Sequence, residues 1–264
     1  MTDADFAQLV TRVLGSSTPR VWSLLVTMFG DLALAPQARL SGGTVNAITA
    51  SIGIKPEATR VALHRLRKED WIDSHRTGRQ TRYGLTPHGR TQTTAAAPRV
   101  YSPAPTDLHA YLVLENPSLP TDWPTDQDTA TTVQIGPKAV VTTASAKTDQ
   151  HLQLLLTTEM ELPRWISDKL CPPDIQSASR DLSQRFKKIL DDHALDKLTL
   201  LQRTAIRVVV VHEWRRLILR TPAFPETLLP DQWHGAECRT AFHKLLTRLP
   251  VPILAALEDA IEAG

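Results

Sequence analysis

Basic side chains gathered on one predicted helix offer the clearest chemistry in this sequence, namely the binding of phosphate groups. The segment 55–68 (KPEATRVALHRLRK) begins with Lys55-Pro56, and proline is tolerated at a first helical position because its missing N–H costs little there. Apolar residues then recur with the i, i+3, i+4 spacing of one buried helix face: Ala58, Val61, Ala62, Leu63 and Leu66. The opposite face is basic and carries Arg60, His64, Arg65, Arg67 and Lys68.

A basic hairpin follows this helix directly. Trp71 and Ile72 begin a predicted strand, residues 77–80 (TGRQ) form a turn signal, and residues 81–85 read as the returning strand. Before the helix, segment 41–53 (SGGTVNAITASIG) predicts a first helix that ends at Gly53. A helix pair followed by a hairpin is the layout of a winged helix-turn-helix, in which the second helix enters the major groove.

We therefore predict that this unit binds double-stranded DNA, with base edges read mainly by Arg60 and His64. The alternative is an ordinary solvated helix face, which the uncompensated charge of the hairpin disfavours. The predicted DNA-binding residues are Lys55, Thr59, Arg60, His64, Arg67, Lys68, Arg76, Arg79 and Arg82.

A second group of functional side chains lies in segment 212–235. His212 and Glu213 are adjacent, so they diverge on a helix, and position 216 is Arg where a metal-binding helix would place a second His. We therefore expect no metal site, no catalytic residues and no enzyme activity. The neighbouring arginines 215, 216 and 220 either form a structural network with Glu213 and Asp231 or bind an anion.

The elements that position these residues form an α+β, multi-domain chain. A support helix is predicted at 18–31, β segments at 108–115 and 139–143, and helices at 177–191, 199–220, 236–249 and 253–263. Small residues and proline place a boundary near 92–105. The predicted domains are 1–95 for DNA binding, 100–172 for a central α+β domain, and 173–264 for a helical domain.

Charge is distributed unevenly along the 264 residues, although the total is only +2. Residues 1–100 carry 13 Lys/Arg and 7 Asp/Glu, whereas residues 101–170 carry 4 and 9. The basic excess thus coincides with the predicted DNA-binding unit. Two cysteines, no apolar run of membrane-spanning length and no signal-peptide pattern predict a cytoplasmic protein.

Four blocks resemble the PaaX-type regulators of phenylacetic acid degradation: RVWSLLVTMFGD (20–31), TRVALHRLRKEDW (59–71), GRQTRYGLTPHG (78–89) and HEWRRLILRTPAFPETLLPDQWHG (212–235). The resemblance implies an N-terminal winged helix, a central ferredoxin-like (Cas2-like) domain and a C-terminal helical domain. It also implies a homodimeric repressor of a catabolic operon, released from its operator by an aryl- or acyl-CoA thioester such as phenylacetyl-CoA. No cofactor is implied.

The effector is expected in a cleft between the C-terminal helices and the rest of the chain, with arginines at its phosphates and ring-bearing residues at its apolar portion. The predicted effector-binding residues are Trp214, Arg215, Arg216, Arg220, Trp233 and His234. For the two tryptophans, a place in the core is the default alternative. A different class of function, a metal-dependent nuclease-like protein, would use Asp107 and Glu115 beside the first central strand.

Overall fold

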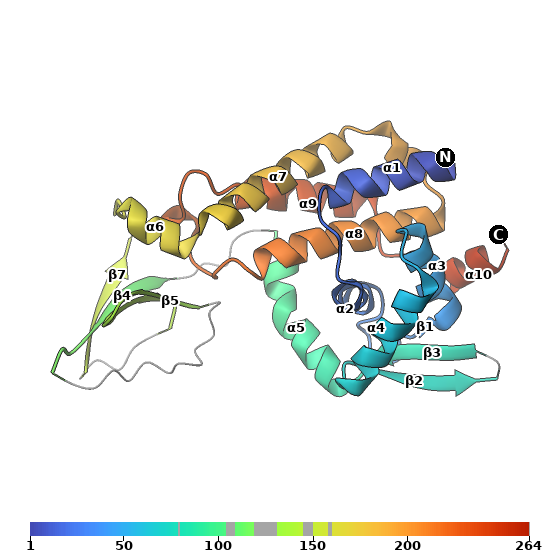
Figure 1. The fold of residues 1–264 in the computed structure, drawn as a ribbon, viewed down its shortest axis with the longest axis horizontal. Helices are drawn as coiled ribbons and strands as arrows, with labels where there is room; N and C mark the ends of the chain where they lie inside the picture. The colour runs from blue at the N-terminus through green and yellow to red at the C-terminus, as the bar shows by residue number, and fades with distance from the viewer. Residues whose placement is uncertain (79, 104–108, 119–130, 145–149, 158–159, 264) are drawn as a thin grey trace. The chain divides into compact units, whose positions relative to one another are not determined.

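The computed structural model describes residues 1–78, 80–103, 109–118, 131–144, 150–157 and 160–263 (Figure 1). The described chain is α+β, as predicted, and contains two small antiparallel sheets. It divides into two compact units: unit 1 holds Met1–Tyr101, Gln184–Arg215 and Thr240–Gly264, and unit 2 holds Ser102–Ser183 and Arg216–Arg239. None of the described helices has the length and apolarity needed to cross a membrane.

Unit 1 begins with two helices whose burial differs. Helix α1 (Asp3–Leu14) is amphipathic and starts at a capping box, in which the Thr2 side chain accepts from the Asp5 N–H. Helix α2 (Val21–Leu32) is buried continuously from Leu24 to Gly30. A helix that is apolar on all sides belongs in a core, so α2 is the support on which the neighbouring elements pack.

The next elements follow the order expected from the sequence. Strand β1 (Leu40–Ser41) leads into α3 (Gly42–Ser51), whose N-terminus is capped by the Ser41 hydroxyl accepting from the Thr44 N–H. Gly53 has φ +87°, a conformation that favours glycine, and turns the chain into α4 (Pro56–Lys68). The helix predicted at 55–68 is thus confirmed.

The predicted hairpin is also confirmed. Strands β2 (Ile72–Thr77) and β3 (Gln80–Leu85) pair antiparallel from Ile72 with Leu85 to Thr77 with Gln80. Strand β1 adds to the free edge of β3, so the sheet order is β1-β3-β2. The hairpin is thereby fixed at its base to the start of α3 (Figure 1).

The range 92–105, where a boundary was predicted, contains the point at which the first stretch of unit 1 ends, at Tyr101, and unit 2 begins, at Ser102. Most of that range is nevertheless helical. Helix α5 (Pro87–Tyr101) runs through it, with Pro98 inside the helix. The Thr86 hydroxyl accepts from the Gly89 N–H and caps the start, and the Trp214 Nε1–H donates to the Val100 carbonyl at 2.8 Å near the end. Small, helix-favouring alanines in this segment therefore belong to a helix packed against the core and not to a linker.

The rest of unit 1 comes from the later parts of helices α7 (Pro173–Leu190) and α9 (Gly235–Arg248) and from helix α8 (Leu200–Ile218) up to Arg215. The 3-10 helix η1 (His193–Lys197) and helix α10 (Leu254–Glu262) also belong to it. A buried ion pair joins α8 to α2, because the Arg207 guanidinium donates to both Asp31 oxygens at 2.7 and 2.8 Å. Tyr101 donates to the same carboxylate at 2.9 Å. The unit boundaries fall inside α7, α8 and α9, so the units do not coincide with the domains predicted at 1–95, 100–172 and 173–264.

Unit 2 is built on a four-stranded antiparallel sheet. Its strands are β4 (Ala110–Glu115), β5 (Thr132–Gly136), β6 (Ala139–Thr142) and β7 (His151–Leu156), in the order β5-β6-β4-β7. Helix α6 (Arg164–Leu170) and the 3-10 helix η2 (Glu226–Leu228) lie wholly in this unit, which also holds the parts of α7, α8 and α9 outside unit 1. Its core holds Ala110, Ile135, Val141, Ile166, Leu170, Phe224 and Leu228.

Candidate nucleic-acid interface

Helix α4 presents a basic face because its apolar residues hold the opposite face in the core. Ala62, Leu63 and Leu66 are buried, and α4 packs on α2. The side chains of Lys55, Arg60, His64, Arg67 and Lys68 are all exposed. Within the described part of the chain, the side chains of Arg60, His64, Arg67 and Lys68 make no hydrogen bond or ion pair. These four cations are therefore available to an external anion.

Two residues of α4 differ from their predicted positions. Thr59 is fully buried, and its hydroxyl donates to the Thr49 hydroxyl at 3.0 Å, which ties α4 to α3. Its side chain is therefore not available to DNA. Val61, predicted to lie in the core, is 70% exposed between Arg60 and His64. Val61 lies three residues before His64, so the two share one helix face, and this spacing indicated an exposed position. Because valine is apolar, the residue was nevertheless assigned to the core.

Arg65 belongs to the edge of this face. Its Nε–H donates to Glu69 at 2.8 Å, and its guanidinium lies 5.0 Å from the centre of the Trp22 ring. An ion pair one turn along the helix and a cation–π contact hold the side chain against the protein. Arg65 is thus positioned by its neighbours, unlike Arg60 and Lys68.

The hairpin contributes less free charge than the sequence suggests. Arg76 is exposed, and its Nε–H donates to the Gly78 carbonyl at 3.3 Å. Arg82 is committed to Glu258 of α10, with an N–O distance of 2.7 Å and 33% of its side chain exposed. Glu258 also accepts from the Ser41 N–H at 3.3 Å. Arg79 lies outside the described residues.

Acidic groups beside the hairpin are neutralised locally. The Arg39 guanidinium donates to Asp73 on β2, and this hydrogen bond is the main reason that the pKa of the Asp73 carboxyl lies below its usual value. His75 Nε2 lies 3.5 Å from the same carboxylate. The carboxylate of Asp73 on β2 is therefore bound by the neighbouring Arg39 and lies close to His75.

The six predicted effector residues are divided between the units. Trp214 and Arg215 belong to unit 1, and Arg216, Arg220, Trp233 and His234 belong to unit 2. Trp214 is completely buried, with its ring centre 5.6 Å from that of Phe242, so it is a core residue. Its indole is not available to stack on a ligand.

The unit 2 members of this set are exposed or half-buried. Arg216 is exposed, and Arg220 donates to Asp174 at 3.0 Å in a pair whose side chains are 58% and 66% exposed. His234 Nδ1 lies 3.5 Å from Glu237, and the His234 backbone N–H donates to Ser179. Trp233 covers Gly235 so closely that a Cβ on that glycine would lie 2.0 Å from the indole.

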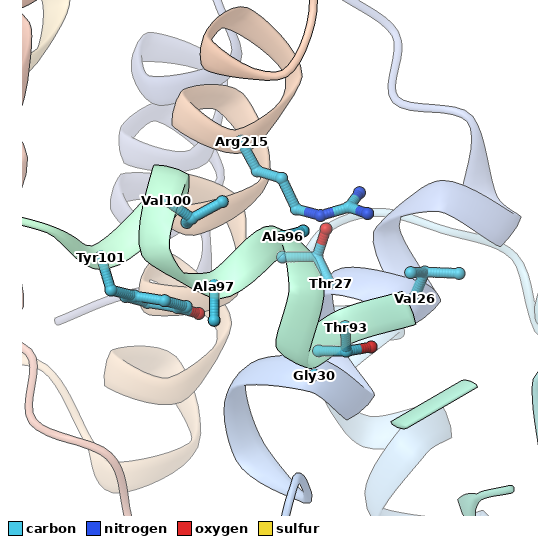
Figure 2. Close-up of a pocket in the computed structure, with 9 residues that line it drawn as sticks. All are labelled: Val26, Thr27, Gly30, Thr93, Ala96, Ala97, Val100, Tyr101 and Arg215. Atoms are coloured by element: carbon cyan, nitrogen blue, oxygen red, sulfur yellow. The ribbon is translucent and has the colours of Figure 1, made fainter. Parts of the chain in front are cut away.

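A hollow in unit 1 involves Arg215. It lies between α2, α5 and α8, opens to solvent, and has a cavity volume of about 20 Å³, enough for about one water molecule. Figure 2 shows the Arg215 side chain reaching from α8 across Ala96 toward Thr27. Burial lowers the pKa of the Arg215 guanidinium, and burial together with Asp31 raises the pKa of the Tyr101 phenol, which also lines the hollow. The sequence predicted neither the hollow nor that these residues would line one cavity.

Residues 20–89 match the model of the PaaX-like protein family, and residues 173–253 match the model of the PaaX-like protein C-terminal domain. The transcriptional repressor PaaX of Escherichia coli (strain K12) is 23% identical over 272 residues, covering 92% of this chain and 84% of that protein. An uncharacterised protein of Mycobacterium tuberculosis is 20% identical with a TM-score of 0.48, covering 91% of this chain and 97% of that chain.

Proposed function

Because this chain belongs to the PaaX-like family, we propose that it is a DNA-binding transcriptional repressor that acts on a catabolic operon and is not an enzyme. The observation that carries the proposal is the face of α4 formed by Arg60, His64, Arg67 and Lys68. A helix end on which several cations lie exposed without internal partners matches the polyanionic backbone of DNA.

We propose that α3, α4 and the β2–β3 hairpin form a winged helix-turn-helix. The element order α2, β1, α3, α4, β2, β3 and the sheet order β1-β3-β2 support this assignment. In that arrangement α4 enters the major groove, with Arg60 and His64 at base edges and Arg67 and Lys68 at phosphates. Arg76 and the region of the turn then approach the flanking backbone.

The test is duplex selection followed by salt titration. A random duplex library is enriched on the full chain, and the best sequence is titrated by fluorescence anisotropy at several salt concentrations. Lys68→Ala removes one phosphate contact, so it should weaken all sequences similarly and reduce the slope of log K against log salt by about one. Arg60→Ala should instead relax the preference at one base position.

The matched control is Arg164→Ala, which removes the same charge from a side chain that is 93% exposed in unit 2. It should leave both the salt slope and the sequence preference unchanged. The proposed function would be disproved if the chain enriched no sequence from the library and if Lys68→Ala left the slope of log K against log salt for duplex binding at the wild-type value.

For the central part we propose a ferredoxin-like domain. The antiparallel order β5-β6-β4-β7 corresponds to the second, third, first and fourth strands of the unit, which is the order of the split βαβ arrangement. The segments that join β4 to β5 and β6 to β7 lie largely outside the described residues. The nuclease alternative gains no support, since the described residues contain no cluster of three potential metal ligands, and Asp107 falls outside them.

We further propose a homodimer that reads a palindromic or near-palindromic site. One reading helix buries little DNA, whereas two copies related by a twofold axis read half-sites about one helical turn, or a multiple of it, apart. Light scattering at micromolar concentration tests this proposal. A monomeric mass together with full operator affinity would contradict it.

The proposed signal is an aryl- or acyl-CoA thioester such as phenylacetyl-CoA, as the family suggests. Such a ligand must bind the DNA-free and DNA-bound states with different affinities, and a coupling of about 1–3 kcal/mol is typical. Calorimetry with a panel of acyl-CoAs on wild type, Arg216→Ala and Arg220→Ala tests the unit 2 arginines. Equal binding by all three proteins would remove both residues from the effector site.

A further inference from the structure

His64 lies among permanent cations on the exposed face of α4. Arg60 comes one helical turn before it, and Arg67 and Lys68 come about one turn after it, so the four side chains share one side of the helix. All four are exposed, and their side chains make no hydrogen bond or ion pair within the described residues. We propose that DNA binding by α4 takes up a proton at His64, so that the affinity for the operator falls as the pH rises. This inference rests on the proposed function and adds a means of regulating it.

The free chain places little negative charge beside this imidazole. The acidic residue of α4 is Glu57, about two helical turns before His64, and Glu69 beyond the helix end is bound by Arg65 at 2.8 Å. Helices α2 and α3 and strand β2 pack against α4. Helix α3 has no charged residue, and the charged residue of α2 is Asp31, which an arginine of α8 binds at 2.7 Å.

Strand β2 provides a contrast in His75. Its Nε2 lies 3.5 Å from the Asp73 carboxylate, which Arg39 also binds, and Arg76 is the next residue along the strand. The imidazolium of His75 therefore has a carboxylate beside it before any DNA arrives. DNA consequently changes the charge around His75 less than it changes the charge around His64.

DNA reverses the electrostatic surroundings of His64. In the free chain, the cations one turn away on either side disfavour a further positive charge. In the complex, phosphates neutralise those cations and bring negative charge to the same face of α4, so the imidazolium becomes favourable. An imidazolium donates through both ring nitrogens, which suits phosphate oxygens and the acceptor edge of guanine. Because the protonated chain binds DNA more tightly, DNA binding and proton uptake are linked reciprocally.

The direction of the pH dependence follows from this linkage. The gain in affinity is complete at a pH low enough for the imidazole of the free chain to be charged. It is lost as the pH rises, and it is gone once the imidazole of the complex has released its proton. For histidine this change falls between about pH 5 and pH 8, so the affinity varies around neutral pH. Uptake of one proton per chain limits the slope of log K against pH to about −1.

The experiment measures the affinity of the full chain for the selected duplex by fluorescence anisotropy, at several pH values and constant ionic strength. His64→Gln retains a polar side chain that cannot be protonated in this range, and His64→Lys carries a permanent charge. His75→Gln is the matched control, because it removes an imidazole that is 61% exposed on the hairpin. Calorimetry in buffers of different ionisation enthalpy counts the protons taken up on binding, and circular dichroism at each pH establishes that the variants are folded.

Wild type and His75→Gln should bind about tenfold more weakly at about pH 8 than at about pH 6, the change that accompanies a shift of one pH unit in the protonation of one group. His64→Gln and His64→Lys should show neither this change nor the proton uptake. Duplex binding with the same pH dependence in wild type and His64→Gln would overturn the inference and leave the proposed repressor function intact. Failure of the chain to bind any duplex would overturn both.

Discussion

At the scale of single residues, side chains of one type on the same helix have different roles. Arg60 and Lys68 extend freely from α4, whereas Arg65 is held by Glu69 and Trp22. Residue type and helical periodicity predicted that all three face outward. The partners of Arg65 could not be predicted, because Trp22 lies on another helix and becomes its neighbour only in the folded chain.

Thr59→Val tests the internal role that the structure gives to Thr59. The change keeps the shape but removes the hydroxyl that donates to Thr49, so unfolding free energy should fall by about 1 kcal/mol. Urea denaturation measures this loss. DNA affinity should be unchanged where the variant is fully folded, since the side chain is buried. Reduced affinity with unchanged stability would instead support the contact with DNA predicted from the sequence.

Val61 should read a thymine methyl group if α4 enters the major groove. It is an exposed apolar side chain between two polar ones, and the C5-methyl of thymine is the apolar group in that groove. Val61→Ala should weaken binding of the selected duplex by about fourfold, roughly the transfer free energy of a methylene group. Replacing individual thymines by uracil should give the same loss at one position in wild type and none there in the variant. If the loss from each thymine-to-uracil replacement were the same in the Val61→Ala variant as in wild type, at every position, the contact of Val61 with a thymine methyl would be excluded.

At the scale of elements, α10 holds the base of the hairpin. Leu257 is completely buried, and Glu258 joins the start of α3 to β3 through Ser41 and Arg82. The amphipathic helix at 253–263 was predicted from its spacing, and the structure confirms it as Leu254–Glu262. Its contact with a hairpin more than 170 residues earlier depends on tertiary folding, which local periodicity does not contain.

Glu258→Gln should therefore strengthen DNA binding at low salt. The change releases the Arg82 guanidinium from an anionic partner, and the salt slope should rise by as much as about one. Folding stability should fall by no more than about 1 kcal/mol, because both side chains are partly solvent-accessible. Arg82→Ala in the wild-type background should change the slope little. Weaker DNA binding by a fully folded Glu258→Gln variant would show that the contact positions the hairpin for DNA.

The elements that the sequence did not predict share a physical cause. Strand β5 and helix α6 are short, at five and seven residues, and too few positions repeat for a period to emerge. Segment 92–105 was assigned to a boundary because proline and small residues punctuate it, yet capping by Thr86 and a bond from Trp214 maintain the helix to Tyr101. The hairpin and the helix pair were predicted well because turn residues and apolar spacing are local signals.

At the scale of the whole molecule, unit 1 is discontinuous in sequence. It takes residues from three separate stretches, and its buried Asp31 pairs with Arg207, which lies 176 residues later in the chain. Arg207→Met should cost about 3–5 kcal/mol of unfolding free energy, because it leaves a buried carboxylate without its cation. Arg12→Met is the control, since its side chain is 53% exposed and pairs at the surface. Similar melting of both variants would show that the buried pair does not stabilise unit 1.

A fragment of residues 1–101 should consequently lack a cooperative transition. In isolation it would expose the α2 and α5 surfaces that Arg207 and Trp214 cover in the full chain. Circular dichroism in increasing urea compares the fragment with the full chain. A sigmoidal transition with a slope appropriate to 101 residues would contradict this expectation and would show that the N-terminal stretch folds independently.

The discontinuity of unit 1 also has a consequence for protein synthesis. A ribosome releases the N-terminal stretch long before it adds Arg207 or α10, so the reading helix emerges while its support is incomplete. Folding of this unit must wait until α10 has been translated, because its contacts join distant parts of the chain. Products terminated before α10 would then be degraded without occupying DNA, and a nonsense mutation just before α10 would have the same consequence as loss of the entire protein.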